Sequence, residues 1–330
     1  MKLCSFVVDG PWGPSPRLGA VTSTRVVDLN SATRLRLESS GATATAAARI
    51  AEALCPTDVV AFIEGGPATR EAAEQAVQWA ADRDPESLAR PAHGPPAIVP
   101  LDGLRYLPAV PAPPLIRDFM AFEGHLLNIY PRLGREIPAV WYELPVYYKG
   151  NSASTGACGQ DIRVPSYASE LDFEVEVAAV IGHGGADIRR ADGLASVYGY
   201  TIYNDMSARA IQSREMSAGL GPAKGKDFRG GHVLGPWLVT ADEVGDPYRL
   251  EVTARVNGEL WTQASTADMH WRFEDMIAHA SRDEVIRPAE IFGSGTVSGG
   301  SGAELGRSLR RGDEVVISCR QLGILRNRVV

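Results

Sequence analysis

The clearest chemical pattern is a row of carboxylates in the segment LDFEVEVAAVIG at residues 171–182. In a β-strand the side chains alternate between faces, so Asp172, Glu174 and Glu176 would share one face, with apolar residues on the other. The strand continues through residues 178–181, which are apolar on both faces and predict burial. Buried like charges repel one another unless a cation lies between them, and glutamates one strand repeat apart (~6.5–7 Å) can converge on one metal ion. The alternative is an ordinary antiparallel strand with one solvated face.

A second acidic segment, GYTIYNDMSARAIQSRE at residues 199–215, ends an apolar strand at Asp205. Arg209 and Gln212 follow it about one helical turn apart, an arrangement that suits a metal ion together with a substrate carboxylate. The alternative is that Asp205 only caps the helical turn that follows it.

A third segment, PPLIRDFMAFEGHLLN at residues 113–128, places Asp118, Glu123 and His125 within eight residues. A histidine close to two acids is a candidate general base, although a lone histidine is also common as a structural residue. Glu123 is the acid nearest to His125 in this segment, and we expect it to orient the imidazole.

A fourth segment, GLGPAKGKDFRGGHVLGPW at residues 219–237, is a loop rich in glycine that carries Lys224 and Lys226. The loop is either flexible surface or a means of delivering an ammonium group to an anionic site. It does not match the phosphate-binding pattern GxxxxGK[ST], because the spacing fails and Asp227 follows Lys226.

Composition excludes several classes of protein. The 330 residues are 45% hydrophobic and 22% charged, which is typical of a globular chain with a substantial core. The net charge is −7 without a run of Lys or Arg, so we expect no nucleic-acid partner. No window approaches the ~18 apolar residues of a membrane helix, and no targeting segment is apparent, so we expect no membrane contact and a cytoplasmic location. The four cysteines form no CxxC pair, which fits a reducing compartment.

The elements that must position these residues divide the chain in two. Residues 1–30 are predicted to form short strands, and helices are predicted over 42–54, 57–63 and 68–81. A proline-rich linker is expected at about 84–103, so the predicted domains are 1–103, an α+β domain with its linker, and 104–330. The second domain is predicted to be β-rich, with strands at 175–182, 199–205, 235–243, 250–261 and 313–319 and a helix at about 272–280. Asn257-Gly258 between two alternating runs indicates a hairpin.

The four segments, in this order, resemble the fumarylacetoacetate hydrolase family, and the similarity covers most of residues 113–330. The resemblance implies an α+β chain in which a mixed β-roll catalytic domain, usually dimeric, follows a smaller N-terminal α+β domain. It implies a divalent ion (Mg²⁺, Mn²⁺ or Ca²⁺) and no organic cofactor. The metal ligands that it implies are four carboxylates: Asp118, Glu174, Glu176 and Asp205. The other positions that match the family motifs are a general base, a lysine and residues near the substrate: His125, Lys226, Tyr148, Gln212 and Thr296. Arg209 and Arg229 are further candidates for contact with an anionic substrate.

The expected activity is metal-dependent hydrolysis of a C–C bond in a β-diketo acid, such as an acylpyruvate or a fumarylacetoacetate-like acid. The metal would polarise a carbonyl and stabilise the leaving enolate, His125 would activate water, and Lys226 would offset the excess of carboxylates. A decarboxylase or tautomerase acting on a β-keto acid is the alternative, because those reactions need the ion and no activated water. The third possibility is a metal-binding protein without catalysis.

Overall fold

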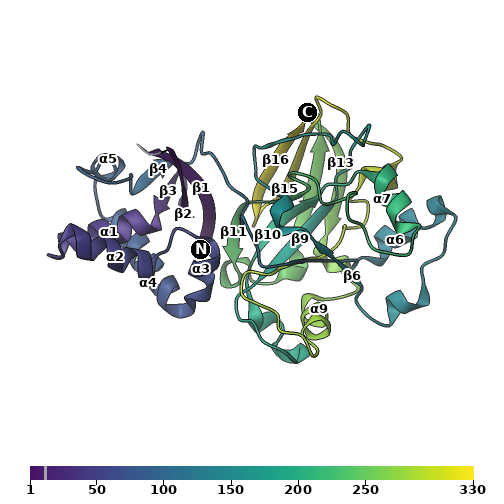
Figure 1. Cartoon of the computed structure of the whole chain (residues 1–330), viewed down its shortest axis with the longest axis horizontal. Coiled ribbons are helices and arrows are strands. Elements are labelled where there is room, and N and C mark those ends of the chain that lie inside the picture. Colours follow the sequence, from purple (N-terminus) through teal and green to yellow (C-terminus); the bar gives the residue numbers. More distant parts are fainter. Residues whose placement is uncertain (11–12) are drawn as a thin grey trace.

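The computed structural model describes residues 1–10 and 13–330. In the N-terminal part of the chain, helices cover a group of four strands (Figure 1). Its strands are β1 (Lys2–Gly10), β2 (Gly13–Val21), β3 (Arg25–Asp28) and β4 (Ile98–Pro100). Its helices are α1 (Leu29–Ser39), α2 (Ala44–Leu54), α3 (Val59–Glu64), α4 (Gly66–Ala81) and α5 (Pro85–Ala89). The three predicted helices are therefore present as α2, α3 and α4.

Helix α1 was not predicted, and its buried face explains why. The buried residues of this helix include Ser31, Thr33 and Arg34, so the hydrophobic repeat that identifies an amphipathic helix is weak. Asp28 caps the helix by accepting a hydrogen bond from the Ser31 N–H, and the same carboxylate pairs with buried Arg17. Helix α5 and strand β4 both lie within residues 84–103, so this segment is more structured than the plain linker we expected.

The rest of the chain, residues 104–330, contributes most of an eleven-stranded sheet with the order β4-β3-β2-β1-β11-β10-β9-β14-β5-β6, in which β7 also pairs with β11. These further strands are β5 (Ile116–Phe119), β6 (Tyr147–Gly150), β7 (Thr155–Gly156), β9 (Val175–Ile181), β10 (Val197–Asp205), β11 (His232–Thr240) and β14 (Ile291–Gly293). The N-terminal strands join this sheet through β1 and β11, with Leu3 opposite Leu238. The domain boundary near residue 103 stays a prediction, because one sheet runs through both parts.

A second sheet, with the order β13-β12-β15-β16-β8, packs against the first and completes the β-rich architecture (Figure 1). Its strands are β8 (Asp161–Ile162), β12 (Glu251–Val256), β13 (Glu259–Ser265), β15 (Glu314–Cys319) and β16 (Gly323–Val329). Asn257 and Gly258 both have positive φ in the turn between β12 and β13, as expected for the hairpin. The remaining helices are α6 (Glu123–Ile129), α7 (Arg209–Met216), α8 (Ala241–Val244), α9 (Phe273–Ala280) and α10 (Gly302–Leu305).

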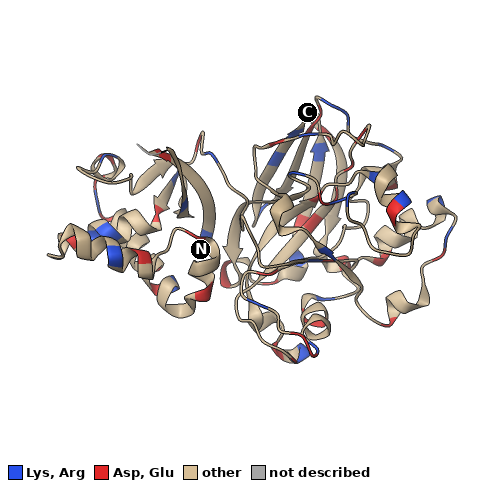
Figure 2. Cartoon of the chain, in the orientation of Figure 1, with Lys and Arg blue, Asp and Glu red and all other residues tan. Residues whose placement is uncertain are grey.

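Strand β9 is buried on both faces, which overturns the reading of residues 171–182 as a strand with one solvated face. Val175 and Val177 face the core between the two sheets, whereas Ala178 and Val180 face the core shared with the N-terminal helices. Glu174 and Glu176 lie on the same face as this second pair and are themselves buried. Figure 2 shows acidic segments in red on the central strands as well as on the outer helices. In the described part of the chain, no helix is long and apolar enough to cross a membrane.

Candidate active site

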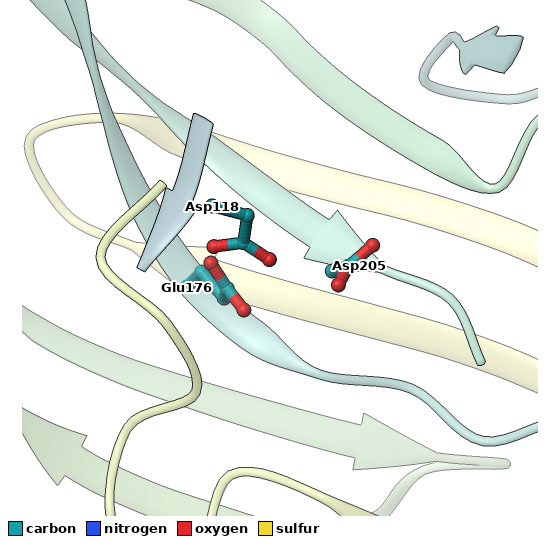
Figure 3. Close-up of side chains that lie close together, drawn as sticks. All are labelled: Asp118, Glu176 and Asp205. Carbon is teal, nitrogen blue, oxygen red and sulfur yellow. The ribbon is translucent and has the colours of Figure 1, made fainter. Parts of the chain in front are cut away.

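Three carboxylates from three strands converge at one place in the large sheet. Asp118 comes from β5, Glu176 from β9 and Asp205 from the end of β10, and one oxygen of each lies within 4.8 Å of the others. Figure 3 shows the three side chains pointing toward one another. Strand β14 lies between β9 and β5, and its Gly293 leaves the space that Asp118 occupies: a Cβ there would be 2.4 Å from Asp118 Oδ1.

The electrostatics of this group fit a divalent cation. Burial, reinforced by the charges of neighbouring carboxylates, raises the pKa values of Asp118 and Glu176 well above their usual range. Asp118 Oδ1 and Glu176 Oε1 are buried without a hydrogen-bond partner among the described residues, and Asp205 Oδ1 also lacks a well-aligned hydrogen bond. Unpaired buried oxygens are costly, and a hard cation such as Mg²⁺, Mn²⁺ or Ca²⁺ would satisfy them. We conclude that the donor set suits the ion that the sequence predicts.

Glu174 occupies a different electrostatic environment from these three. Its carboxylate contacts both Lys226 and Arg209, the latter at 2.6 Å. Burial opposes ionisation of Glu174, but Arg209 and Lys226, with a smaller contribution from His125, outweigh it and lower its pKa. Glu174 is therefore an ionised neighbour of the three-carboxylate group, and its role as a fourth ligand stays a prediction.

Lys226 lies among the carboxylates of the site. Its side chain is only 2% exposed, and Nζ lies 2.5 Å from Asp205 Oδ2 in addition to its contact with Glu174. Burial would lower the pKa of Lys226, but Asp205 and Glu174 outweigh burial and raise it, so the ammonium form persists. An ammonium at this position offsets part of the negative charge that the site would otherwise concentrate.

His125 has a carboxylate partner that the sequence did not indicate. On helix α6, His125 Nδ1 lies 2.9 Å from Glu304 Oε2, and His125 keeps 13% of its side chain exposed while Glu304 keeps 1%. Our expectation that Glu123 orients the imidazole is wrong in this structure, because Glu123 accepts a hydrogen bond from the exposed Tyr142 hydroxyl at 2.6 Å. Gly124 permits the close approach of α6, since a Cβ there would lie 2.2 Å from Ser298 Oγ.

Glu304 is held in place by the start of helix α10. Its carboxylate accepts hydrogen bonds from Asn128 Nδ2 and from the N–H groups of Gly299 and Ser301, and it completes a capping box with Ser301. Burial opposes ionisation, but His125 and these donors outweigh it and lower the pKa of Glu304. The S-x-x-E pattern at 301–304 is a recognisable helix start. Nothing in that local pattern indicates that its glutamate also faces His125.

The loop that precedes Lys226 is held in place by hydrogen bonds to a single carboxylate. Glu215, near the end of α7, accepts hydrogen bonds from the backbone N–H groups of Ala223, Lys224 and Gly225 at 3.1, 2.8 and 3.0 Å. Burial is the largest single influence and would raise the pKa of Glu215, but the three backbone donors together outweigh burial and lower it. A carboxylate that accepts several backbone hydrogen bonds orders the chain around it.

We expect that replacing Glu215 with alanine loosens residues 219–225. Loss of charge-assisted hydrogen bonds, each worth ~1.5–3 kcal/mol, should speed amide hydrogen exchange at residues 223–225 by about tenfold or more. Exchange measured by mass spectrometry tests this, with Glu64→Ala, at an exposed helix end, as the control. Unchanged exchange in the loop would show that other contacts hold it.

The residues predicted to contact substrate differ in how they relate to the three carboxylates. The Tyr148 hydroxyl donates a hydrogen bond to Asp205 Oδ2 at 2.8 Å, and Gln212 Oε1 accepts one from Arg209 at 3.2 Å. Thr296 is buried in the segment after β14, next to Gly295, whose N–H donates to Glu176 Oε2. Arg229 is exposed. The substrate contacts of Tyr148, Arg209, Gln212, Arg229 and Thr296 stay predictions.

The sequence of the catalytic part matches a known family. Residues 115–330 match the model of the fumarylacetoacetate (FAA) hydrolase C-terminal domain, which is about two thirds of the chain. This chain belongs to the fumarylacetoacetate hydrolase family. The three converging carboxylates, Lys226 and the His125–Glu304 pair all lie within the matched residues.

Curated relatives of this chain include a tautomerase and an uncharacterized protein. The rat oxaloacetate tautomerase Fahd2a, mitochondrial, is 37% identical over 187 residues, which cover 56% of this chain and 59% of that relative. An uncharacterized Staphylococcus aureus protein is 30% identical over 231 residues, 69% of this chain and 72% of the relative. The alignment thus spans less than two thirds of the length of the tautomerase.

Solved structures share the whole fold at lower sequence identity. Maleylpyruvate hydrolase from Sphingobium sp. SYK-6, in complex with manganese(II) and pyruvate, aligns with a TM-score of 0.70 at 23% identity, covering 100% of this chain and 99% of that one. The 5-carboxymethyl-2-hydroxymuconate delta-isomerase from Mycobacterium smegmatis aligns with a TM-score of 0.66 at 20% identity over the same shares. These similarities confirm the predicted α+β, β-rich fold.

Proposed function

We propose that this protein is a divalent-metal-dependent hydrolase that cleaves a C–C bond in a small β-diketo acid. Membership in this family supports the proposal that the protein is an enzyme. The unpaired oxygens of Asp118 and Glu176 support the proposal that it binds a metal ion. A bound divalent ion supplies electrostatic stabilisation of the negative charge that develops on a substrate oxygen. Asp118, Glu176 and Asp205 would hold that ion.

The observation that carries hydrolysis is the pairing of His125 with Glu304. Nδ1 lies 2.9 Å from the Glu304 carboxylate, which only accepts hydrogen bonds, so in the neutral imidazole the hydrogen would be on Nδ1 and the lone pair on Nε2. Nε2 is thus free to accept a proton from water, whose oxygen then bonds to a carbonyl carbon of the substrate. The C–C bond beside that carbon breaks, its electron pair leaves with the other fragment as an enolate, and His125 returns the proton to that fragment.

The second candidate is tautomerisation of a 2-oxo acid such as oxaloacetate. The rat oxaloacetate tautomerase named above supports it, since that protein is 37% identical to this chain over the aligned region. The same residues would serve, with His125 accepting the proton of the enol oxygen and returning it to the neighbouring substrate carbon, which converts the enol to the ketone. No bond to water forms in this reaction, so the two candidates differ in whether solvent oxygen enters the product.

One experiment separates these two candidates. The purified protein with Mn²⁺ or Mg²⁺ is incubated with acylpyruvates and with oxaloacetate in ¹⁸O-labelled water. Hydrolysis predicts two shorter acids, one of them with ¹⁸O in its new carboxylate. Tautomerisation predicts a faster loss of enol absorbance with the carbon skeleton intact. If acylpyruvates stay intact while oxaloacetate enol disappears faster, hydrolysis is the wrong proposal and tautomerisation the right one.

A further inference from the structure

A buried histidine outside the predicted site lies directly beside one of the predicted metal ligands. His232 begins β11 and is the antiparallel register partner of Asp205 on β10, so the two side chains share one face of the sheet. Its side chain is fully buried, and Nδ1 lies 3.2 Å from Asp205 Oδ1 and 2.7 Å from the Tyr203 hydroxyl. No local sequence pattern singles out this histidine, because its Gly-Gly-His segment resembles an ordinary loop.

The other ring nitrogen of His232 is held by a second acid. Nε2 lies 3.0 Å from Asp227 Oδ1, and that same oxygen accepts a hydrogen bond from the Asn151 N–H at 2.8 Å. Gly150 leaves the room that the ring needs, since a Cβ there would lie 2.9 Å from His232 Cε1 and 3.0 Å from Nε2. The end of β6 therefore provides both the space for the imidazole and the backbone group that fixes its partner Asp227.

The two oxygens of Asp205 face different groups. Oδ2 contacts Lys226 at 2.5 Å and accepts the Tyr148 hydroxyl at 2.8 Å, whereas His232 Nδ1 is at ion-pair distance from Oδ1. The hydrogen bond of His232 Nδ1 is with the Tyr203 hydroxyl at 2.7 Å, and the same nitrogen packs 3.2 Å from Asp205 Oδ1, so the ring edge limits where that carboxylate can turn. Groups in contact with metal ligands commonly set the orientation of those ligands.

We propose that His232 is a positioning residue that holds the Asp205 carboxylate in the orientation that binds the divalent ion. The inference rests on the metal centre of the proposed function. Asn151 positions Asp227, Gly150 leaves room for the imidazole of His232, and the imidazole in turn positions Asp205. It assigns no contact between His232 and the substrate.

Three replacements of His232 distinguish positioning from mere packing. Asparagine keeps an N–H near the Nδ1 position, glutamine keeps one near Nε2, and leucine keeps neither. We expect His232→Leu and His232→Gln to weaken Mn²⁺ binding by ~10–100-fold in calorimetry, as losses around metal ligands typically do, whereas His232→Asn should retain most of the affinity. Gly150→Ala should also weaken Mn²⁺ binding, because the added methyl group would displace the imidazole of His232.

Melting temperatures and one control variant make the result decisive. Thr201 lies on the same strand as Asp205, and its hydroxyl donates a hydrogen bond to the Trp237 carbonyl on β11. Thr201→Val removes this hydrogen bond and should lower stability with no change in Mn²⁺ affinity. If the unaltered protein does not bind Mn²⁺, the metal centre itself is wrong. If it does bind and His232→Leu binds equally well, or if asparagine and leucine variants lose affinity equally, the positioning role of His232 alone is overturned.

Discussion

Replacing His125 with alanine should lower the turnover of the substrate by ~10²–10⁴-fold, the usual contribution of a general base. The imidazole is the group that accepts the proton in both proposed reactions, and alanine leaves no proton acceptor at that position. Metal affinity should remain, because the His125 side chain is paired with Glu304 and is not one of the three converging carboxylates. Turnover, Mn²⁺ affinity and melting temperature measured on one preparation test this expectation.

Two glutamate variants show whether the orientation of His125 matters. Glu304→Gln keeps the size of the side chain but removes the charge that faces Nδ1, so we expect turnover to fall by ~10²-fold or more. Glu123→Gln is the matched control on the same helix, and its activity should be unchanged because Glu123 contacts Tyr142. If a folded His125→Ala protein keeps its turnover, His125 is not the base. If metal affinity, melting temperature and turnover fall together, His125 is a structural residue.

The parts of the site that lie on regular strands were predictable from the sequence. Alternation in β9 placed Glu174 and Glu176 on one face, and the apolar run that follows them predicted their burial, which the structure confirms. Asp205 was recognised because it ends an apolar strand. In each case one local pattern carried the information, since the period of a strand fixes which side chains share a face.

The partners that complete the site depend on contacts between distant segments, and no local pattern reports these. Glu304 reaches His125 from 179 positions away in the chain because α10 packs beside α6. The sequence around His125 offered only Glu123, which the helix directs toward Tyr142 instead. The pairing of Glu174 with Arg209 and Lys226 was also hidden, because Arg209 at the start of α7 and Lys226 after the loop held by Glu215 are both distant from Glu174 in the sequence.

Replacing Glu176 with glutamine should weaken Mn²⁺ or Mg²⁺ binding by ~10-fold or more, equivalent to ~1.4 kcal/mol of binding free energy. Glutamine has nearly the same shape but lacks the charge that attracts the ion. The metal-free variant should be at least as stable as the unaltered protein, because burial and the charges of Asp118 and Asp205 already raise the pKa of Glu176 well above its usual range. The rise in melting temperature on adding Mn²⁺ should therefore be smaller in the variant. Glu290→Gln, a buried glutamate paired with Arg117, is the matched control and should lower stability with no change in metal affinity.

The raised pKa values also fix the direction of the pH dependence of metal binding. Asp118 and Glu176 with raised pKa values retain protons at a pH where ordinary carboxyls have lost them, and the ion must displace those protons. Raising the pH removes them, so Mn²⁺ affinity should increase with pH above the range in which ordinary carboxyls titrate, with proton release detectable by calorimetry in buffers of different ionisation enthalpy. In Glu176→Gln one of the two titrating groups is gone, and we expect both the slope and the proton release to decrease. An affinity that stays constant with pH in the unaltered protein, with no proton release, would mean that the ion binds elsewhere.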